Sequence, residues 1–462
     1  MVFSSLNFLF LFLPIVFLLT LVVPSVTGKN VVLLVGSIFF YAWGEPVYVV
    51  LMLFSIAFNY VMGLELGRLT DQARRKRNLV FTLVVDLFIL GFFKYYGLCV
   101  ETVNALFHLN LAVRELSLPI GTSFYTFQTL SYIIDVYRGN VRVQKSPLKF
   151  ALYITMFPQL VAGPIVKYAD IEQQLTHRKV TLTKCGQGVE RLVIGLGKKV
   201  LLANNLGLLY ETIQAMPQRT FLTAWLGIIA YTMQIYFDFS GYSDMAIGMG
   251  KMFGFTFLEN FNYPYLSASI TEFWRRWHIS LSSWFRDYVY IPLGGNRCSA
   301  PRHIFNLLVV WLLTGLWHGA GWNFVLWGLY YGILLILEKY VFGRLLERLP
   351  STVQHLYALF LVAIGWVLFS NTDFSQMTAY LGNLFGRGVS GFADSATWYY
   401  LKSNLVLLLL SGLCCTPGLL NWFRDKTRRR PYLSLVPVLV IFLISVAYLV
   451  YSSYNPFLYF RF

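Results

Sequence analysis

The stretch from Ile304 to Leu337 contains no Lys, Arg, Asp or Glu and is long enough to cross a bilayer as helix. His318 nevertheless lies inside it, flanked by Gly315, Gly319 and Gly321. Glycines allow backbone or substrate to approach the histidine closely. An ionisable group at membrane depth is costly unless it faces a cavity or a partner, so His318 is a candidate for chemistry. The alternative is a histidine that is hydrogen-bonded between helices.

The composition predicts a protein that crosses the lipid bilayer several times. Hydrophobic residues make up 57% of the 462 residues and charged residues only 13%, against about 25% charged in an average soluble domain. In a chain this apolar, the formal net charge of +16 is typical of basic cytoplasmic loops, and we expect no nucleic-acid partner. The five cysteines show no CxxC spacing, so neither a disulfide framework nor a metal site is expected.

Apolar runs recur along the whole chain, and their lengths predict about 10 to 12 transmembrane helices. The run 6–23 has no basic segment before it and no clear cleavage site after it, which favours a retained first span. The basic segments 68–77 and 424–430 should be cytoplasmic, and this places both termini outside. We expect a single membrane-embedded domain over 1–462, with a last span and an aromatic tail over 432–462.

Two stretches do not have the pattern of a simple span. The first, 152–165, lies between basic segments and is broken by Pro158, Gly163 and Pro164. It predicts a re-entrant or tilted element, because non-helical backbone at membrane depth needs a cavity or other protein beside it. The second, 271–295, is aromatic and basic together.

The second stretch contains a further histidine. On a continuous helix, Arg275, His278, Ser282 and Arg286 would share one face. The arginine fork suits phosphate or pyrophosphate because it binds two oxygens at once. Spacing alone favours the alternative, an interfacial amphipathic helix with its tryptophans at the headgroup level.

Other polar residues in apolar surroundings are less specific. Asp238 and Asp244 could orient a histidine or pair with an arginine, or they could mark a polar helix break satisfied by neighbouring helices. The remaining histidines fall in loops or at span ends, where ordinary interfacial residues are expected: His108, His177, His303 and His355. The sequence shows no Ser–His–Asp pattern, zinc-protease motif or phosphate-binding loop.

Several long motifs give the chain a resemblance to a known family. They are YFDFSGYSDMAIG (236–248), NYPYLSASITEFWRRWHISLSSWFRDYVYIPLGGN (262–296) and LLTGLWHGAGWNFVLWG (312–328). These segments resemble the membrane-bound O-acyltransferases. The segments 119–139 and 157–168 are similar to the bacterial alginate O-acetyltransferase branch of that family. Proteins of teichoic-acid D-alanyl transfer are more distant relatives.

The resemblance implies an all-α ring of about 11 to 12 transmembrane helices with re-entrant elements and a central funnel, set in a bacterial inner membrane. The family's histidine at the centre of the funnel matches His318, and the second histidine of the branch matches His278. The implied donor is a cytoplasmic acyl thioester, acetyl-CoA, with no metal. Arg275, Arg276 and Trp277 are candidates for shaping the donor side.

The end of the chain also resembles a family feature. Related systems end a chain, or a small partner, with an aromatic motif proposed to carry the acyl group on tyrosine, and this tyrosine matches Tyr459. The alternative is an aromatic belt at the interface. The implied acceptor is a cell-envelope polysaccharide or exopolysaccharide, reached through a secreted or membrane-anchored hydrolase-like (SGNH-type) acetyltransferase. Two alternatives stay open. One is transfer of D-alanyl or another acyl group, and the other is a transporter of polysaccharide or acyl carrier without chemistry, although the sequence shows no inverted repeat that would favour a transporter.

Overall fold

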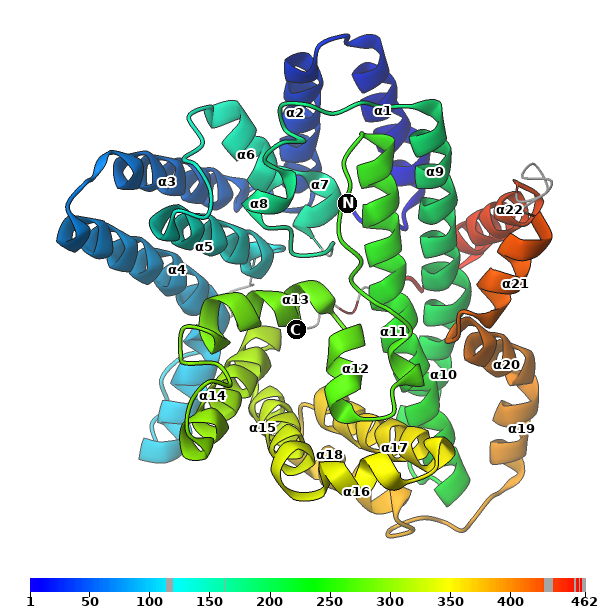
Figure 1. Cartoon of the computed structure of the whole chain (residues 1–462). Coiled ribbons are helices and arrows are strands. Elements are labelled where there is room, and N and C mark those ends of the chain that lie inside the picture. The colour runs from blue at the N-terminus through cyan, green and yellow to red at the C-terminus, as the bar shows by residue number, and fades with distance from the viewer. Residues whose placement is uncertain (114–118, 162, 428–434, 453, 457, 459–462) are drawn as a thin grey trace. The chain divides into compact units, whose positions relative to one another are not determined.

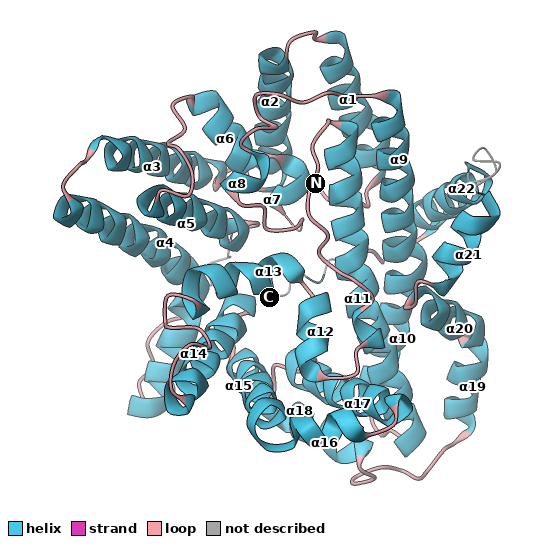
Figure 2. Cartoon of the chain, viewed as in Figure 1, coloured by secondary structure: helices cyan, strands magenta, loops and turns pink. Residues whose placement is uncertain are grey.

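The described part of the chain is built from helices joined by loops, and it contains no strand (Figure 2). The predicted class, an all-α polytopic membrane protein, is thereby confirmed. The computed structural model describes residues 1–113, 119–161, 163–427, 435–452, 454–456 and 458. It divides into two compact units, 1–192 with 243–258 and 193–242 with 259–462.

The first unit contains the helices coloured blue to cyan in Figure 1 and much of α9. Its helices are η1 (Phe8–Phe12), α1 (Leu13–Val22), α2 (Val26–Gly44), α3 (Val49–Arg68), α4 (Gln72–Phe107), α5 (Thr122–Arg138), α6 (Pro147–Thr155), α7 (Phe157–Leu160), α8 (Tyr168–Ile171) and α9 (Leu182–Gly197). α5 packs against α3 and α4, and most of its residues are buried. It ends where Gly139 adopts φ +78°, a left-handed conformation that favours glycine at a helix end.

The proline- and glycine-rich stretch 152–165 is interrupted, as its sequence predicts. α6 ends at Thr155, α7 covers one turn, and the chain continues without a helix as far as Lys167 in the residues described there. Val161, Ile165 and Val166, in the non-helical part, are buried. Broken backbone is therefore surrounded by protein, which is the condition under which it is tolerated at membrane depth.

The second unit holds the remaining helices and the candidate site. Its helices are η2 (Lys198–Ala203), α10 (Asn204–Gln214), the first part of α11 (Phe221–Met252), η3 (Pro264–Leu266), α12 (Ile270–Arg276), α13 (Ile279–Phe285), η4 (Arg286–Tyr290), α14 (Ala300–His318), α15 (Trp322–Leu337), η5 (Glu338–Phe342), α16 (Gly343–Arg348), α17 (Ser351–Ser370), α18 (Phe374–Leu384), α19 (Ser395–Ser403), α20 (Leu405–Cys414), α21 (Gly418–Thr427) and α22 (Leu435–Tyr451). α14 packs against α15, and α15 against α17.

Six helices among the described residues are long and apolar enough to cross a membrane. They are Val26–Gly44, Val49–Arg68, Gln72–Phe107, Leu182–Gln214, Trp322–Arg348 and Ser351–Ser370. Shorter apolar helices cover Phe8–Val22, Leu405–Cys414 and Leu435–Tyr451. The chain is therefore a multi-pass membrane protein, as its composition predicts.

Candidate active site

A tight helical hairpin places His318 at a turn. α14 ends at His318, and α15 begins just after it. A Cβ added to Gly315 would lie 2.3 Å from the carbonyl oxygen of Phe324, and one added to Gly328 would lie 2.3 Å from that of Trp311. Only glycine fits at these two positions, so the small residues set the close approach of the helices. The apolar stretch 304–337 is thus two helices, with the histidine at the end of the first.

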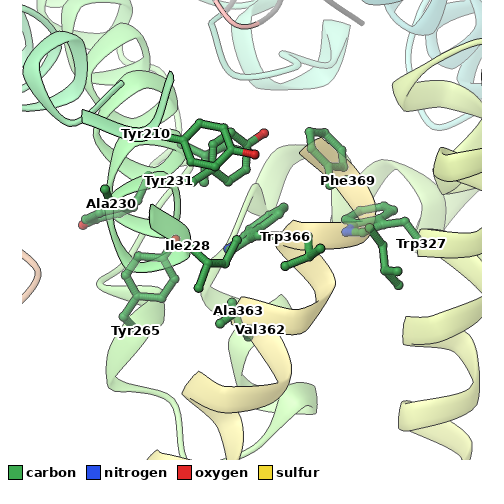
Figure 3. Packing of buried hydrophobic residues seen from close by; sticks show 14 of the residues in the cluster. Tyr210, Ile228, Ala230, Tyr231, Tyr265, Trp327, Val362, Ala363, Trp366 and Phe369 are labelled. Carbon is green, nitrogen blue, oxygen red and sulfur yellow. The ribbon is translucent and has the colours of Figure 1, made fainter. Parts of the chain in front are cut away.

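Aromatic rings surround the imidazole of His318. The ring centroids of Trp317, Trp327 and Phe369 lie 5.0, 5.0 and 5.3 Å from that of His318, each nearly perpendicular to it. Figure 3 shows Trp327 and Phe369 within the buried aromatic core that α15 and α17 contribute. His318 itself is 7% exposed. Edge-to-face packing of this kind holds a ring in one orientation.

His278 lies between α12 and α13 in a strained conformation. Its φ is +44°, which is rare for any residue other than glycine. Its Nδ1 accepts a hydrogen bond from the backbone N–H of Leu281 at 3.3 Å, so His278 caps α13. Because Nδ1 accepts, the proton of the neutral ring is on Nε2. His278 lies outside the six long apolar helices, and burial lowers its pKa to about 4. The ring is therefore a neutral hydrogen-bond donor at physiological pH.

One indole connects the two histidines. The ring centroid of Trp317 lies 5.9 Å from that of His278, at an interplanar angle of 88°, and 5.0 Å from that of His318, at 79°. All three rings are buried. The structure thus brings together the two histidines that the sequence singles out, although 40 positions separate them in the chain.

A cavity of about 820 Å³ opens beside His278. Arg275, His278, Ser282 and Arg286 all line it. The continuous helix expected for them is wrong, because the backbone leaves the helical conformation at Trp277 and His278. The four side chains share a cavity instead of a helix face. A volume in this range suits a cofactor-sized ligand.

The remaining predicted donor-side residues lie elsewhere in the same unit. Arg276 forms an ion pair with Glu272 at 2.8 Å and donates to the backbone carbonyl of Asn262. Trp277 is 1% exposed and stacks on Phe273 in the aromatic core. Neither is among the residues that line the cavity. Both therefore act on the shape of the α12 segment.

His303 is a cavity residue that the sequence does not reveal. It is 3% exposed, and it lies near the start of α14, at the end of the apolar stretch where the sequence predicts an ordinary interfacial residue. Its Nε2 lies 2.8 Å from the hydroxyl of Tyr290 and 3.2 Å from Nζ of Lys339, and its Nδ1 lies 2.8 Å from the hydroxyl of Tyr340. His303, Tyr290 and Lys339 line the cavity. Their places in the sequence give no signal of this cluster.

The walls of the cavity carry an excess of positive charge. Lys339 and Arg344 line it together with Arg275 and Arg286, against the carboxylates of Glu338 and Glu347. Glu338 accepts hydrogen bonds from the backbone N–H groups of Ile270 and Thr271 and from two hydroxyls, so its charge is engaged at the start of α12. The cavity is therefore suited to an anionic ligand.

The two carboxylates of the YFDFSGYSDMAIG motif have basic partners, each within its own unit. Asp244 forms an ion pair with Arg191 at 2.6 Å. Asp238 forms a buried ion pair with Lys199. α11 runs continuously through both, so the predicted polar helix break is absent from it. Tyr459, the remaining predicted site residue, lies outside the described residues.

Comparison with protein families gives a match over most of this region. The family model for MBOAT, the membrane-bound O-acyltransferase family, matches residues 78–372. The chain belongs to the membrane-bound O-acyltransferase family. The matched range contains His278, His318 and the residues that line the cavity.

Individual relatives extend the similarity to the whole chain. A protein named Probable alginate O-acetylase AlgI from Azotobacter vinelandii is 39% identical over 503 residues, covering 100% of both chains. Its namesake from Pseudomonas aeruginosa is 46% identical over 374 residues, 80% of this chain and 72% of the relative. Peptidoglycan O-acetyltransferase from Helicobacter pylori is 33% identical over 432 residues, 84% and 81%. The chain is accordingly an O-acyltransferase of the membrane, as the resemblance implies.

Proposed function

We propose that this O-acyltransferase moves acetyl groups from cytoplasmic acetyl-CoA across the membrane for O-acetylation of a cell-envelope polysaccharide or exopolysaccharide. The observation that carries the proposal is the position of His278. It lines the positively charged cavity on one side and contacts Trp317, the indole that also packs on His318. Two of the relatives are named for alginate and one for peptidoglycan, which supports a glycan as final acceptor.

The cavity is the proposed donor site. Arg275 and Arg286 line it, and guanidinium groups bind phosphate oxygens in pairs. Arg276 and Trp277 support the donor side indirectly, through the ion pair and the aromatic packing that hold α12. Thr314 also lines the cavity and lies one helical turn before His318, so the cavity wall comes within one turn of this histidine along α14.

The two histidines have different roles in the proposed reaction. His318 transfers the proton, and His278 donates a hydrogen bond. His318 takes the proton of the acceptor hydroxyl while its oxygen attacks the thioester carbonyl. The oxyanion that forms accepts a hydrogen bond from Nε2–H of His278, whose tautomer is set by Leu281. The C–S bond then breaks, the protonated His318 returns its proton to the thiolate, and the products are an acetyl ester and free coenzyme A thiol.

The first acceptor in this scheme is the phenol of Tyr459. Its pKa, near 10 in model peptides, makes it easier to deprotonate than a sugar hydroxyl, and its ester is easier to cleave afterwards. A secreted or membrane-anchored SGNH-type acetyltransferase would then catalyse attack of a polysaccharide hydroxyl on this ester, which regenerates the phenol. The membrane enzyme need never bind a long polymer.

The location follows from the same scheme. The enzyme lies in the bacterial inner membrane as a single domain over 1–462, with both termini outside and the basic segments 68–77 and 424–430 in the cytoplasm. The segment 432–462 consists of the last span and the aromatic tail, and this span delivers the tail to the outer side, where the acyl group is passed on.

One-sided supply of donor tests the proposed direction of transfer. The purified enzyme is reconstituted in vesicles with its orientation measured by protease protection, and acetyl-CoA is added to one face. Acetyl transfer should require donor on the face that exposes 68–77. Equal rates with donor confined to either face would reject the proposal.

A further inference from the structure

A buried ion pair in the second unit holds the end of the chain by its backbone. Lys199 and Asp238 are both 1% exposed. Besides Asp238, Nζ of Lys199 donates to the backbone carbonyl of Pro456. The other carboxylate oxygen of Asp238 accepts from the backbone N–H of Leu458 at 3.2 Å. The pair thus contacts the tail through one carbonyl and one N–H, which do not depend on the tail's side chains.

A third residue extends this contact. Nδ2 of Asn204 donates to the side-chain oxygen of Asn455 at 3.2 Å and lies 3.4 Å from the carbonyl oxygen of Tyr454. Asn204 begins α10, directly after the π-helical segment η2 that contains Lys199, and α22 packs against η2. π-Helical segments inside longer helices are frequent at functional sites. We refer to Lys199, Asn204 and Asp238 as the tail clamp.

Burying the ion pair of the clamp costs desolvation free energy, which favours a function beyond stability. Lys199 lies within a helix apolar enough to cross a membrane, and Asp238 lies within α11. Two apolar residues of similar size in place of a buried ion pair are often as stable or more stable. Here the pair supplies the donor and the acceptor that the tail backbone uses.

The clamp holds a residue of the buried core of the second unit. Leu458 is 3% exposed and belongs to the same buried cluster as Trp327 and Phe369, whose rings contact His318. Leu458 directly precedes Tyr459 in the sequence.

From these contacts we infer that Lys199, Asn204 and Asp238 are positioning residues that hold the chain's own C-terminal segment, as far as Leu458, against the core of the second unit. With Tyr459 as the proposed acceptor, the clamp holds the residue that precedes the acceptor in the sequence, so acetyl is received without release of the tail. The inference rests on the proposed role of Tyr459. It adds that the acceptor is fixed by backbone contacts, and that the partner must take the acetyl group from a docked tail.

Substitutions at Leu458 test the clamp with the ion pair intact. Leu458→Pro removes the N–H that Asp238 accepts, whereas Leu458→Ala, the matched control, loses a similar side chain and keeps the N–H. In the full-length enzyme in nanodiscs, we expect Leu458→Pro to lower kcat for acetyl transfer about 30-fold below Leu458→Ala, with the donor KM within twofold. Hydrogen exchange of the tail peptide should be at least tenfold faster in the proline variant.

A second variant tests the other side of the contact. Lys199→Met/Asp238→Leu removes both charges, so neither is left unpaired, and it should reproduce the faster exchange and the lower kcat of Leu458→Pro. Arg191→Met/Asp244→Leu removes the ion pair of the other unit and should leave tail exchange unchanged. Equal kcat for Leu458→Pro and Leu458→Ala, or unchanged tail exchange in the Lys199/Asp238 variant, would overturn the clamp.

Tyr459→Phe separates this inference from the proposed function. If Tyr459→Phe acetylates polymer at the normal rate, the tyrosine acceptor is rejected, whatever the clamp does. If Tyr459→Phe is inactive while Leu458→Pro equals Leu458→Ala, only the clamp is rejected. Mass analysis of the C-terminal peptide after incubation with acetyl-CoA should find the acetyl group on the wild-type tail and a reduced amount on Leu458→Pro.

Discussion

The ring nitrogen Nδ1 of His278 accepts a hydrogen bond from the backbone N–H of Leu281 at 3.3 Å. This contact gives the histidine two separable properties, a helix cap through Nδ1 and a hydrogen-bond donor at Nε2. The left-handed backbone at His278 directs the side chain towards the N–H of Leu281. This conformation costs free energy, and strained residues of this kind are frequent at active sites.

The two properties of His278 can be separated by substitution. In His278→Asn, the side-chain oxygen can still accept from Leu281, and asparagine tolerates a left-handed backbone, but the donor at the Nε2 position is lost. We expect a fold close to wild type and a kcat about 100-fold lower, the typical effect of one lost oxyanion donor. Steady-state acetyl transfer and thermal unfolding in nanodiscs measure both. Wild-type kcat in a folded His278→Asn enzyme would exclude the donor role.

The stability of the enzyme should depend on His278 under acid conditions. Burial lowers the pKa of His278 to about 4 in the folded protein, whereas unfolded histidine titrates near 6.5. Between these values the unfolded state binds more protons, so stability is lost as pH falls from about 6.5 to 4, by up to about 3 kcal/mol. Thermal unfolding from pH 7.5 to 5 should show a smaller loss for His278→Asn than for wild type. Parallel curves for the two proteins would contradict this origin of the pH dependence.

Donor affinity should depend on Arg275 and much less on Arg276. Arg275 lines the cavity, whereas Arg276 pairs with Glu272 away from the lining. Loss of a charged hydrogen bond to phosphate costs roughly 1.5–3 kcal/mol, so Arg275→Ala should raise the donor KM at least about tenfold. Arg276→Ala is the matched control and should change KM less than threefold. A larger effect of Arg276→Ala would move the phosphate site away from this cavity.

The hairpin that positions His318 should tolerate no side chain at Gly328. A Cβ there would lie 2.3 Å from the backbone carbonyl of Trp311, which cannot move aside as a flexible side chain could. Gly328→Ala should lower the free energy of unfolding by about 1–3 kcal/mol, the usual cost of overpacking. Gly412→Ala, where the added Cβ meets nothing within 4 Å, should be neutral or slightly stabilising. Thermal unfolding compares the two, and equal stability would refute the close approach of α14 and α15.

The candidate site residues could be singled out in the sequence because they are polar residues in an apolar background. His318 is the polar exception in a stretch without Lys, Arg, Asp or Glu, and the glycines beside it predict the close backbone approach that Gly315 makes. The spacing of Arg275, His278, Ser282 and Arg286 predicts one face of a continuous helix, whereas the structure has two short helices, α12 and α13, and the four residues line one cavity. Nothing in a sequence indicates that His278 adopts a positive φ, because this conformation depends on its surroundings.

Contacts between distant segments could not be predicted. His303 contacts Tyr290, which precedes the α14–α15 hairpin, and Lys339 and Tyr340, which follow it. No local sequence pattern around these residues indicates the contact. Lys199 and Pro456 are 257 positions apart. A lysine in an apolar helix signals a buried partner, but the identity of that partner appears only in the folded chain.

The central role of His318 is tested most directly by acetyl transfer from acetyl-CoA in the purified His318→Ala enzyme. Loss of a general base should lower kcat by about 10²–10⁴-fold, while thermal stability and donor KM stay close to wild type. Retention of acetyl transfer within threefold of wild type in a normally folded His318→Ala enzyme would contradict proton transfer by this residue.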